Sequence, residues 1–171
     1  ELKRAFDDGI DLRATVALSN YGDPTPILQL ISSEGLHDLI TIKGAVDIAD
    51  EFGAHDVFVL PLLSTVGTTC IPNTLLEAFS AGIAVISSDI PTLREADPVA
   101  ANIFFPPDDD RALTKGLKDL AENRIRMEKV RAHNRETYLN TYTLTLYTLN
   151  TANFYQTLSG LPTAHKNGIP L

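Results

Sequence analysis

The stretch that decides the fold covers residues 54–95 and reads AHDVFVLPLLSTVGTTCIPNTLLEAFSAGIAVISSDIPTLRE. An apolar strand over residues 56–62 leads into a polar loop, then into a helix over residues 73–81 and a second apolar strand over residues 83–87. In an open α/β sheet, ligands bind where loops leave the carboxyl ends of parallel strands. Two such loops lie in this stretch, so we expect any binding or catalytic site there first.

The alternation of strand and helix continues on both sides of this stretch. It predicts an α/β fold, with a parallel sheet covered by helices on both faces and further helices at the carboxyl end. Asp47 is placed to cap a short helix, and Gly53 and Gly82 are placed to end helices. The other predicted strands cover residues 11–18, 39–42 and 102–105, and the other predicted helices of this part cover residues 27–33 and 48–52.

The last third of the chain reads as three helices of different character. The first begins at the acids 108–110, which suit the positive end of a helix dipole, and a charged, exposed helix over residues 124–138 follows it. A final helix covers residues 141–158. The core stripe of the first helix is Leu113, Leu117 and Leu120, and the apolar side of the last is Leu144, Tyr147, Phe154, Tyr155 and Leu158.

We expect residues 1–160 to form one domain and residues 161–171, which show no periodicity, to form a loose tail. The opening ELKRAFDD reads as the second half of a helix with no start. We therefore expect the chain to be a fragment whose first strand is missing.

Composition narrows the function classes. The chain has 171 residues, 44% of them hydrophobic, and a net charge of −8, which argues against a broad surface for nucleic acid. Cys70 is the only cysteine, so there is no internal disulfide and no thiolate metal cluster. The apolar runs are too short to span a bilayer, and we expect a cytoplasmic protein. The histidines are scattered in sequence and are expected at the surface, without a metal: His37, His55, His133 and His165.

The acids and the loop of the deciding stretch have more than one interpretation. Glu77, on an otherwise apolar helix, is either an acceptor for ligand hydroxyls at the edge of the buried face or an ordinary helix acid. The loop over residues 67–72 leads to the helix start, where backbone N–H groups can face an anion, although an ordinary connecting loop has the same pattern. Glu95 either points to the same crevice or pairs with Arg94 or another basic group, and Asp108–Asp110 are better explained by a helix cap than by a metal.

Three blocks of this sequence resemble a known family. HDVFVLP, PNTLLEAFSAGIAVISSDIPTLRE and NIFFPPDDDRALTKGL are similar, in order and spacing, to the carboxyl-terminal half of family 4 glycosyltransferases of the GT-B type. The resemblance covers roughly residues 11–158. It implies a Rossmann-like domain that binds a nucleotide-sugar, a separate amino-terminal domain that holds the acceptor, and sugar transfer with retention of configuration, without a metal or another cofactor. It also implies a peripheral association of the full protein with the inner face of a membrane.

Carried over by position, the resemblance assigns roles to single residues. Glu77 matches the second acid of the family's motif of two glutamates separated by seven residues, and that acid accepts hydrogen bonds from the donor ribose. The first acid, which contacts the transferred sugar, falls at Thr69, and the glycine next to it falls at Cys70. The following residues match the turn whose backbone contacts the sugar and phosphates: Ile71, Pro72, Asn73 and Thr74.

Two departures from the family pattern leave the function open. Threonine at position 69 cannot place a negative charge beside the sugar, and no residue before Glu1 supplies the family's Arg and Lys pair for the diphosphate. We therefore expect a donor-binding domain that is inactive alone. The alternatives are a non-catalytic nucleotide-sugar-binding or scaffold domain of the same fold, favoured by Thr69, and a flavodoxin-like signalling domain, for which the acidic cluster at the strand ends is missing.

Overall fold

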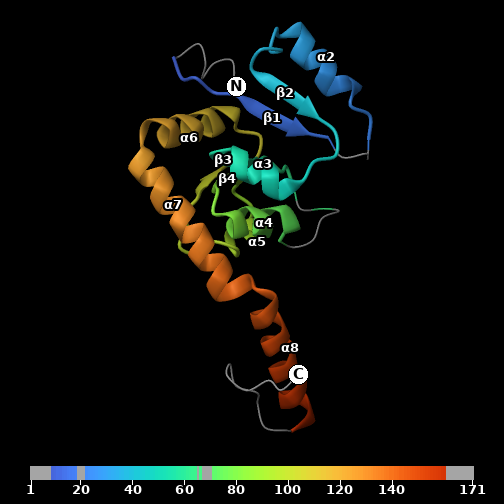
Figure 1. Cartoon of the computed structure of the whole chain (residues 1–171), viewed down its shortest axis with the longest axis vertical. Coiled ribbons are helices and arrows are strands. Elements are labelled where there is room, and N and C mark those ends of the chain that lie inside the picture. Colours follow the sequence, from blue (N-terminus) through green and yellow to red (C-terminus); the bar gives the residue numbers. More distant parts are fainter. Residues whose placement is uncertain (1–8, 19–21, 65, 67–70, 161–171) are drawn as a thin grey trace.

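Two parallel ladders form the framework of the molecule. A computed structural model describes residues 9–18, 22–64, 66 and 71–160 (Figure 1). Strands β1 (Ala14–Ala17) and β2 (Ile40–Lys43) pair in one ladder, and β3 (Val57–Leu60), β4 (Ala84–Ser88) and β5 (Ile103–Phe105) form another in the order β3-β4-β5. Both ladders are parallel throughout. The predicted α/β class with parallel strands is confirmed, and in the described residues the strands are divided between two ladders.

The helices lie close to the predicted positions. They are α2 (Thr25–Ser33), α3 (Ile48–Ala54), α4 (Asn73–Ala81), α5 (Pro91–Arg94), α6 (Asp110–Glu122), α7 (Arg124–Thr137) and α8 (Leu144–Ser159). Asp47 caps α3 by accepting from the Ala49 N–H at 2.9 Å, as the sequence predicts. The prediction that Gly53 closes this helix is wrong, because α3 continues to Ala54. Asp109 caps α6 by accepting from the Ala112 N–H.

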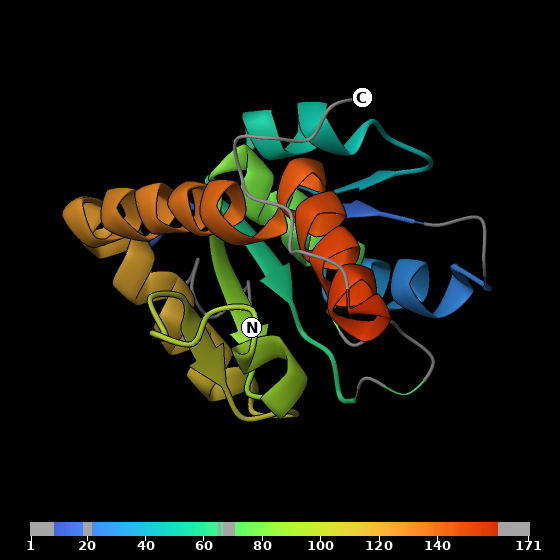
Figure 2. The same ribbon diagram turned by 90° about the horizontal axis from the view of Figure 1, so that it is seen from below.

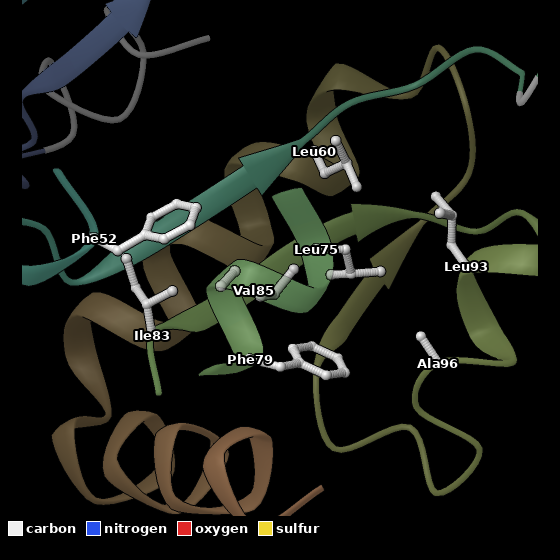
Figure 3. Close-up of a cluster of buried hydrophobic side chains, with 9 residues drawn as sticks. Phe52, Leu60, Leu75, Phe79, Ile83, Val85, Leu93 and Ala96 are labelled. Atoms are coloured by element: carbon white, nitrogen blue, oxygen red, sulfur yellow. The ribbon is translucent and has the colours of Figure 1, made fainter. Parts of the chain in front are cut away.

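Strand β4 is the centre of the core. All of its residues are buried, and its side chains alternate between two apolar clusters because successive residues of a strand point to opposite faces. Val85 lies in the cluster with Phe52, Leu75 and Phe79 from α3 and α4 (Figure 3). Ile86 lies in the other cluster, whose helical members are Leu117, Leu120, Met127 and Val130 from α6 and α7. Helices therefore cover both faces of this ladder, as predicted.

Helix α7 is not the exposed helix that its charges predict. Met127, Val130 and Asn134, three or four residues apart, are buried, because a helix needs only one such stripe to pack against a sheet. Asn134 and Asn102 exchange amide hydrogen bonds of 2.7 and 2.9 Å. The Asn134 side-chain amide also donates to the Ile83 backbone carbonyl at 2.7 Å, and Oδ1 of Asn102 accepts from the Val85 N–H at 3.1 Å. Side-chain amides thus satisfy backbone groups at the start of β4.

Two histidines expected at the surface are instead half-buried and hydrogen-bonded. His55 bridges α3 to β1, with Nδ1 2.7 Å from the Glu51 carbonyl oxygen and Nε2 2.9 Å from the Thr15 hydroxyl. His133 Nε2 lies 3.1 Å from Oδ1 of the buried Asp97. Exposure statistics for histidine do not predict the contacts of His55 with Thr15 and of His133 with Asp97, because these partners are distant in sequence. His37 is exposed as expected, and His165 lies outside the described residues.

The carboxyl end of α4 is held by α7. Gly82 ends α4 in the left-handed conformation, at φ +68°. Its carbonyl accepts a hydrogen bond of 3.2 Å from Arg131 Nε, and the Ser80 carbonyl accepts one from Arg135. The carbonyl groups at the end of a helix have no intrahelical donor, so these two arginines supply the N–H donors for the last carbonyls of α4.

The last helix projects away from the ladders (Figure 1). A π-helix, η1 (Tyr138–Tyr142), and the extended residue Thr143 separate it from α7, and the two helices meet at an angle (Figure 2). Leu149 is the one buried residue of α8, and its predicted apolar side is exposed to between 61% and 77%: Leu144, Tyr147, Phe154, Tyr155 and Leu158. None of the described helices has the length and apolar character needed to cross a membrane. The predicted tail lies outside the described residues.

Replacing Gly82 tests the closure of α4. Gly82→Ala should lower the free energy of unfolding by about 1–2 kcal/mol, the cost of a left-handed alanine, and its Cβ would also lie 3.4 Å from the Arg135 Cβ. Gly53→Ala is the matched control, because Gly53 lies inside a helix and a Cβ there meets nothing within 4 Å. The control should be neutral or stabilising by up to about 1 kcal/mol. Equal urea midpoints for the two variants would contradict the role of Gly82 as the left-handed residue that ends α4.

Candidate functional site

Three strands end together at one edge of the larger ladder. Parallel pairing places Leu60 beside Ser87 and Ser88 beside Phe105. The loops that leave these ends lead into α4, α5 and α6. This is the edge at which open α/β sheets bind ligands, and the residues predicted for the site lie on the first two of these connections.

The start of α4 has no side-chain cap among the residues that the structure describes. Pro72 occupies the N-cap position, and no described side chain accepts from the first turn. The first N–H groups of a helix have no intrahelical acceptor, so those of Asn73 and Thr74 are available to a ligand. Ile71 packs against the core cluster of α3 and α4, which anchors the entry to the helix. Thr69 and Cys70 lie outside the described residues.

Glu77 lies one turn after the helix start. Residues three and four apart share a helix face, so Glu77 follows Asn73 and Thr74 on one side of α4, and all three are exposed. The buried side of the helix consists of Leu75, Ala78 and Phe79. In the described part of the chain, the Glu77 carboxylate has no hydrogen-bond or ion-pair partner. The structure thus groups an acceptor with free N–H donors on one open face, whereas the sequence placed Glu77 nearer the buried side.

Glu95 belongs to another element, α5. It is the exposed C-cap residue of α5, and its neighbour Arg94 pairs with Asp89 through a hydrogen bond of 2.7 Å from Nη2 to Oδ2. The guanidinium holds the pKa of the Asp89 carboxyl below its ordinary value, and it lies 4.6 Å from the centre of the Phe104 ring. The expected Glu95–Arg94 pair is therefore absent among the described contacts. Glu95 lines a cavity of about 400 Å³ that does not include Glu77.

Sequence reasoning missed a polar group at the end of β2. Lys43 Nζ lies 2.6 Å from Glu51 Oε1, and the lysine side chain is 42% exposed. Its place as the last residue of a strand was the available signal. Ser87, at the end of β4, is also notable, because its buried hydroxyl has no hydrogen-bond partner among the described residues.

The described residues offer no cluster of three His, Cys, Asp or Glu side chains that could hold a metal ion. The expectation that sugar transfer needs neither a metal nor another cofactor stays a prediction.

Comparisons with known proteins agree on the family and the fold. The family model for Glycosyl transferases group 1 matches residues 2–123, more than half of the chain. No curated protein matches the chain significantly in sequence. Among solved structures, a glycosyltransferase from Rickettsia africae aligns with a TM-score of 0.78 and 17% identity over 92% of this chain and 43% of its own.

Two further solved structures show the same fold. Sucrose-phosphate synthase from Thermosynechococcus elongatus aligns with a TM-score of 0.72 and 21% identity over 84% of this chain and 38% of its own. A pneumococcal O-GlcNAc transferase, solved in complex with UDP and GlcNAc, aligns with a TM-score of 0.73 and 17% identity over 92% of this chain and 32% of its own. The chain thus spans less than half the length of each of these structures.

Proposed function

The chain belongs to the glycosyl transferases group 1 family, and we propose on that basis that it is the donor-binding part of a retaining glycosyltransferase. The observation that carries the proposal is the open face of α4, where Glu77 follows an uncapped helix start. One structure of similar fold contains UDP and GlcNAc, which supports a nucleotide-sugar as the donor. The acceptor would be held by a part of the protein that these residues do not include.

The chemistry of the face suits a nucleoside diphosphate. A carboxylate offers two acceptor oxygens for the vicinal hydroxyls of a ribose, and such charge-assisted hydrogen bonds are stronger than neutral ones. The N–H groups of Asn73 and Thr74, at the positive end of the α4 dipole, would contact a phosphate or the sugar. Ile71 and Pro72 would shape the turn, and Thr69 and Cys70 would lie beside the transferred sugar.

Turnover would need more than this face. A leaving nucleoside diphosphate develops charge that must be stabilised, and the resemblance assigns that task to an Arg and a Lys that no residue of this chain is matched to. We therefore propose that these residues bind the donor and do not transfer the sugar alone. The chain's coverage of 43%, 38% and 32% of the similar structures supports this division of labour.

The ribose role of Glu77 can be tested by calorimetry. UDP and GDP are titrated into the 171-residue chain, into Glu77→Ala and into Glu122→Ala. Because a hydrogen bond to a charged group is worth about 1.5–3 kcal/mol, Glu77→Ala should weaken nucleotide binding by about tenfold or more. Glu122 is an exposed acid at the far end of α6 and serves as the matched control, so its variant should bind as the parent does. Unchanged affinity in Glu77→Ala would reject the ribose role.

A second candidate function is a non-catalytic nucleotide-sugar-binding or scaffold domain. Thr69 favours it, because the family's first acid, which contacts the transferred sugar, is replaced there. The neutral threonine can still donate and accept one hydrogen bond. A donor-binding domain and a scaffold differ in whether the loop at position 69 lines a sugar pocket.

Restoring the acid distinguishes the two candidates. If the loop lines a sugar pocket, Thr69→Glu should raise the affinity for a UDP-sugar by about tenfold, the worth of one charge-assisted hydrogen bond, and leave the affinity for UDP unchanged. Thr68→Glu adds the same charge one residue earlier and should not produce this difference. Equal effects of Thr69→Glu on UDP and on UDP-sugar, measured by the same titration, would favour the scaffold.

A further inference from the structure

A cavity of about 400 Å³ lies beside the end of α7, and no residue of α4 lines it. Its walls come from the segment after α5, from the last turns of α7 and from η1. This volume falls within the range of small-molecule sites. The lining residues that matter here are Glu95, His133, Glu136 and Tyr142, with Ala96, Pro98 and Val99 forming an apolar part.

The cavity carries uncompensated negative charge. Neither Glu95 nor Glu136 has a hydrogen-bond or ion-pair partner in the described parts of the chain, and no Lys or Arg lines the cavity. The two nearest arginines in sequence are engaged elsewhere, because Arg94 is paired with Asp89 and Arg135 donates to the Ser80 carbonyl.

A third carboxylate lies directly beneath the lining. The side chain of Asp97 is 1% exposed, and its Oδ2 accepts from the N–H and the side-chain amide of Asn102 at 2.8 and 2.9 Å. Its Oδ1 lies 3.1 Å from His133 Nε2, which is also 3.2 Å from the Thr137 hydroxyl. These contacts fix the imidazole at the wall and hold Asp97 in place.

Burial and the neighbouring carboxylates also affect the Tyr142 phenol of this cavity. Its pKa is raised above the ordinary value, first by burial and then by the charges of Asp97 and Glu95. Tyr142 and Glu95 both line the cavity, so an aromatic ring and a carboxylate share its wall. Carboxylates together with an aromatic face are what proteins use to hold organic cations.

We propose that this cavity is a second binding site, which takes a small organic cation with an alkyl chain and a protonated amine. Glu95 and Glu136 would pair with the ammonium, the Tyr142 ring would contact it by its face, and the apolar part would contact the alkyl chain. A metal ion fits less well, because no group of three ligating side chains occurs among the described residues. An anionic ligand would meet two carboxylates and no Lys or Arg in the lining.

The proposal is tested with 1,4-diaminobutane, titrated into the 171-residue chain and followed by chemical shifts of the cavity residues. Glu95→Gln and Glu136→Gln should each weaken binding by about tenfold, because each removes one charge-assisted contact. Glu128→Gln is the matched control, since Glu128 lies on α7 outside the cavity and pairs with Arg124, and it should bind as the parent does. The substituted side chains are exposed, so thermal unfolding should show all variants folded.

A neutral analogue and a metal complete the test. 1,4-Butanediol has nearly the same shape without the charge and should not bind, and Mg²⁺ at equal concentration should not displace the diamine. Failure of the diamine to bind, equal binding of the diol, displacement by Mg²⁺ or an equal loss in Glu128→Gln would each overturn the proposal. Raising the salt concentration should weaken binding. None of these outcomes depends on nucleotide binding at Glu77.

Discussion

The buried amide of Asn134 is the contact on which the rest of the larger ladder depends. Its side chain is 0% exposed, and it joins α7 to the start of β4 through the Ile83 carbonyl and to the segment before β5 through Asn102. A buried polar group that loses its partner costs about 1–3 kcal/mol. Every member of this network is satisfied, so the network stabilises one arrangement of α7 on the ladder and disfavours others.

Helix α4 is held by α7 at its carboxyl end and is exposed at its amino end. Arg131 and Arg135 close the carboxyl end of α4, next to Asn134. The amino end of α4 has no side-chain cap among the described residues, and Glu77 follows it on an exposed face. The helix is thus held at one end and available at the other, which is what a binding site on a rigid scaffold requires. Helix α8, with one buried residue, contributes little to this scaffold.

The parts of the fold that local signals specify were predictable, and those that distant polar contacts specify were not. Helix α4 has the predicted bounds because Pro72 and Gly82 mark its ends, and the apolar run over residues 83–87 correctly indicated the strand that the structure shows as β4. Apolar periodicity does not predict that Asn134 is buried or that His133 contacts Asp97, 36 positions away. For the same reason, the charged sequence of α7 led to the prediction of an exposed helix. The same limit applies to the site, where the sequence identified Glu77 but placed it at the edge of the buried face, and where the cavity beside Glu95 follows only from the coordinates.

The free energy of unfolding of Asn134→Leu tests the central contact most directly. Leucine has a similar shape and no hydrogen-bonding group, so the Ile83 carbonyl would lose the bond from Asn134, and the Asn102 side chain would lose its two bonds to Asn134 while keeping those to Asp97 and to the Val85 N–H. We predict a loss of about 3 kcal/mol in urea unfolding, against a change within about 0.5 kcal/mol for Asn150→Leu on the exposed side of α8. Equal unfolding free energies for the two variants would contradict the account, because α7 would then be held by apolar packing alone.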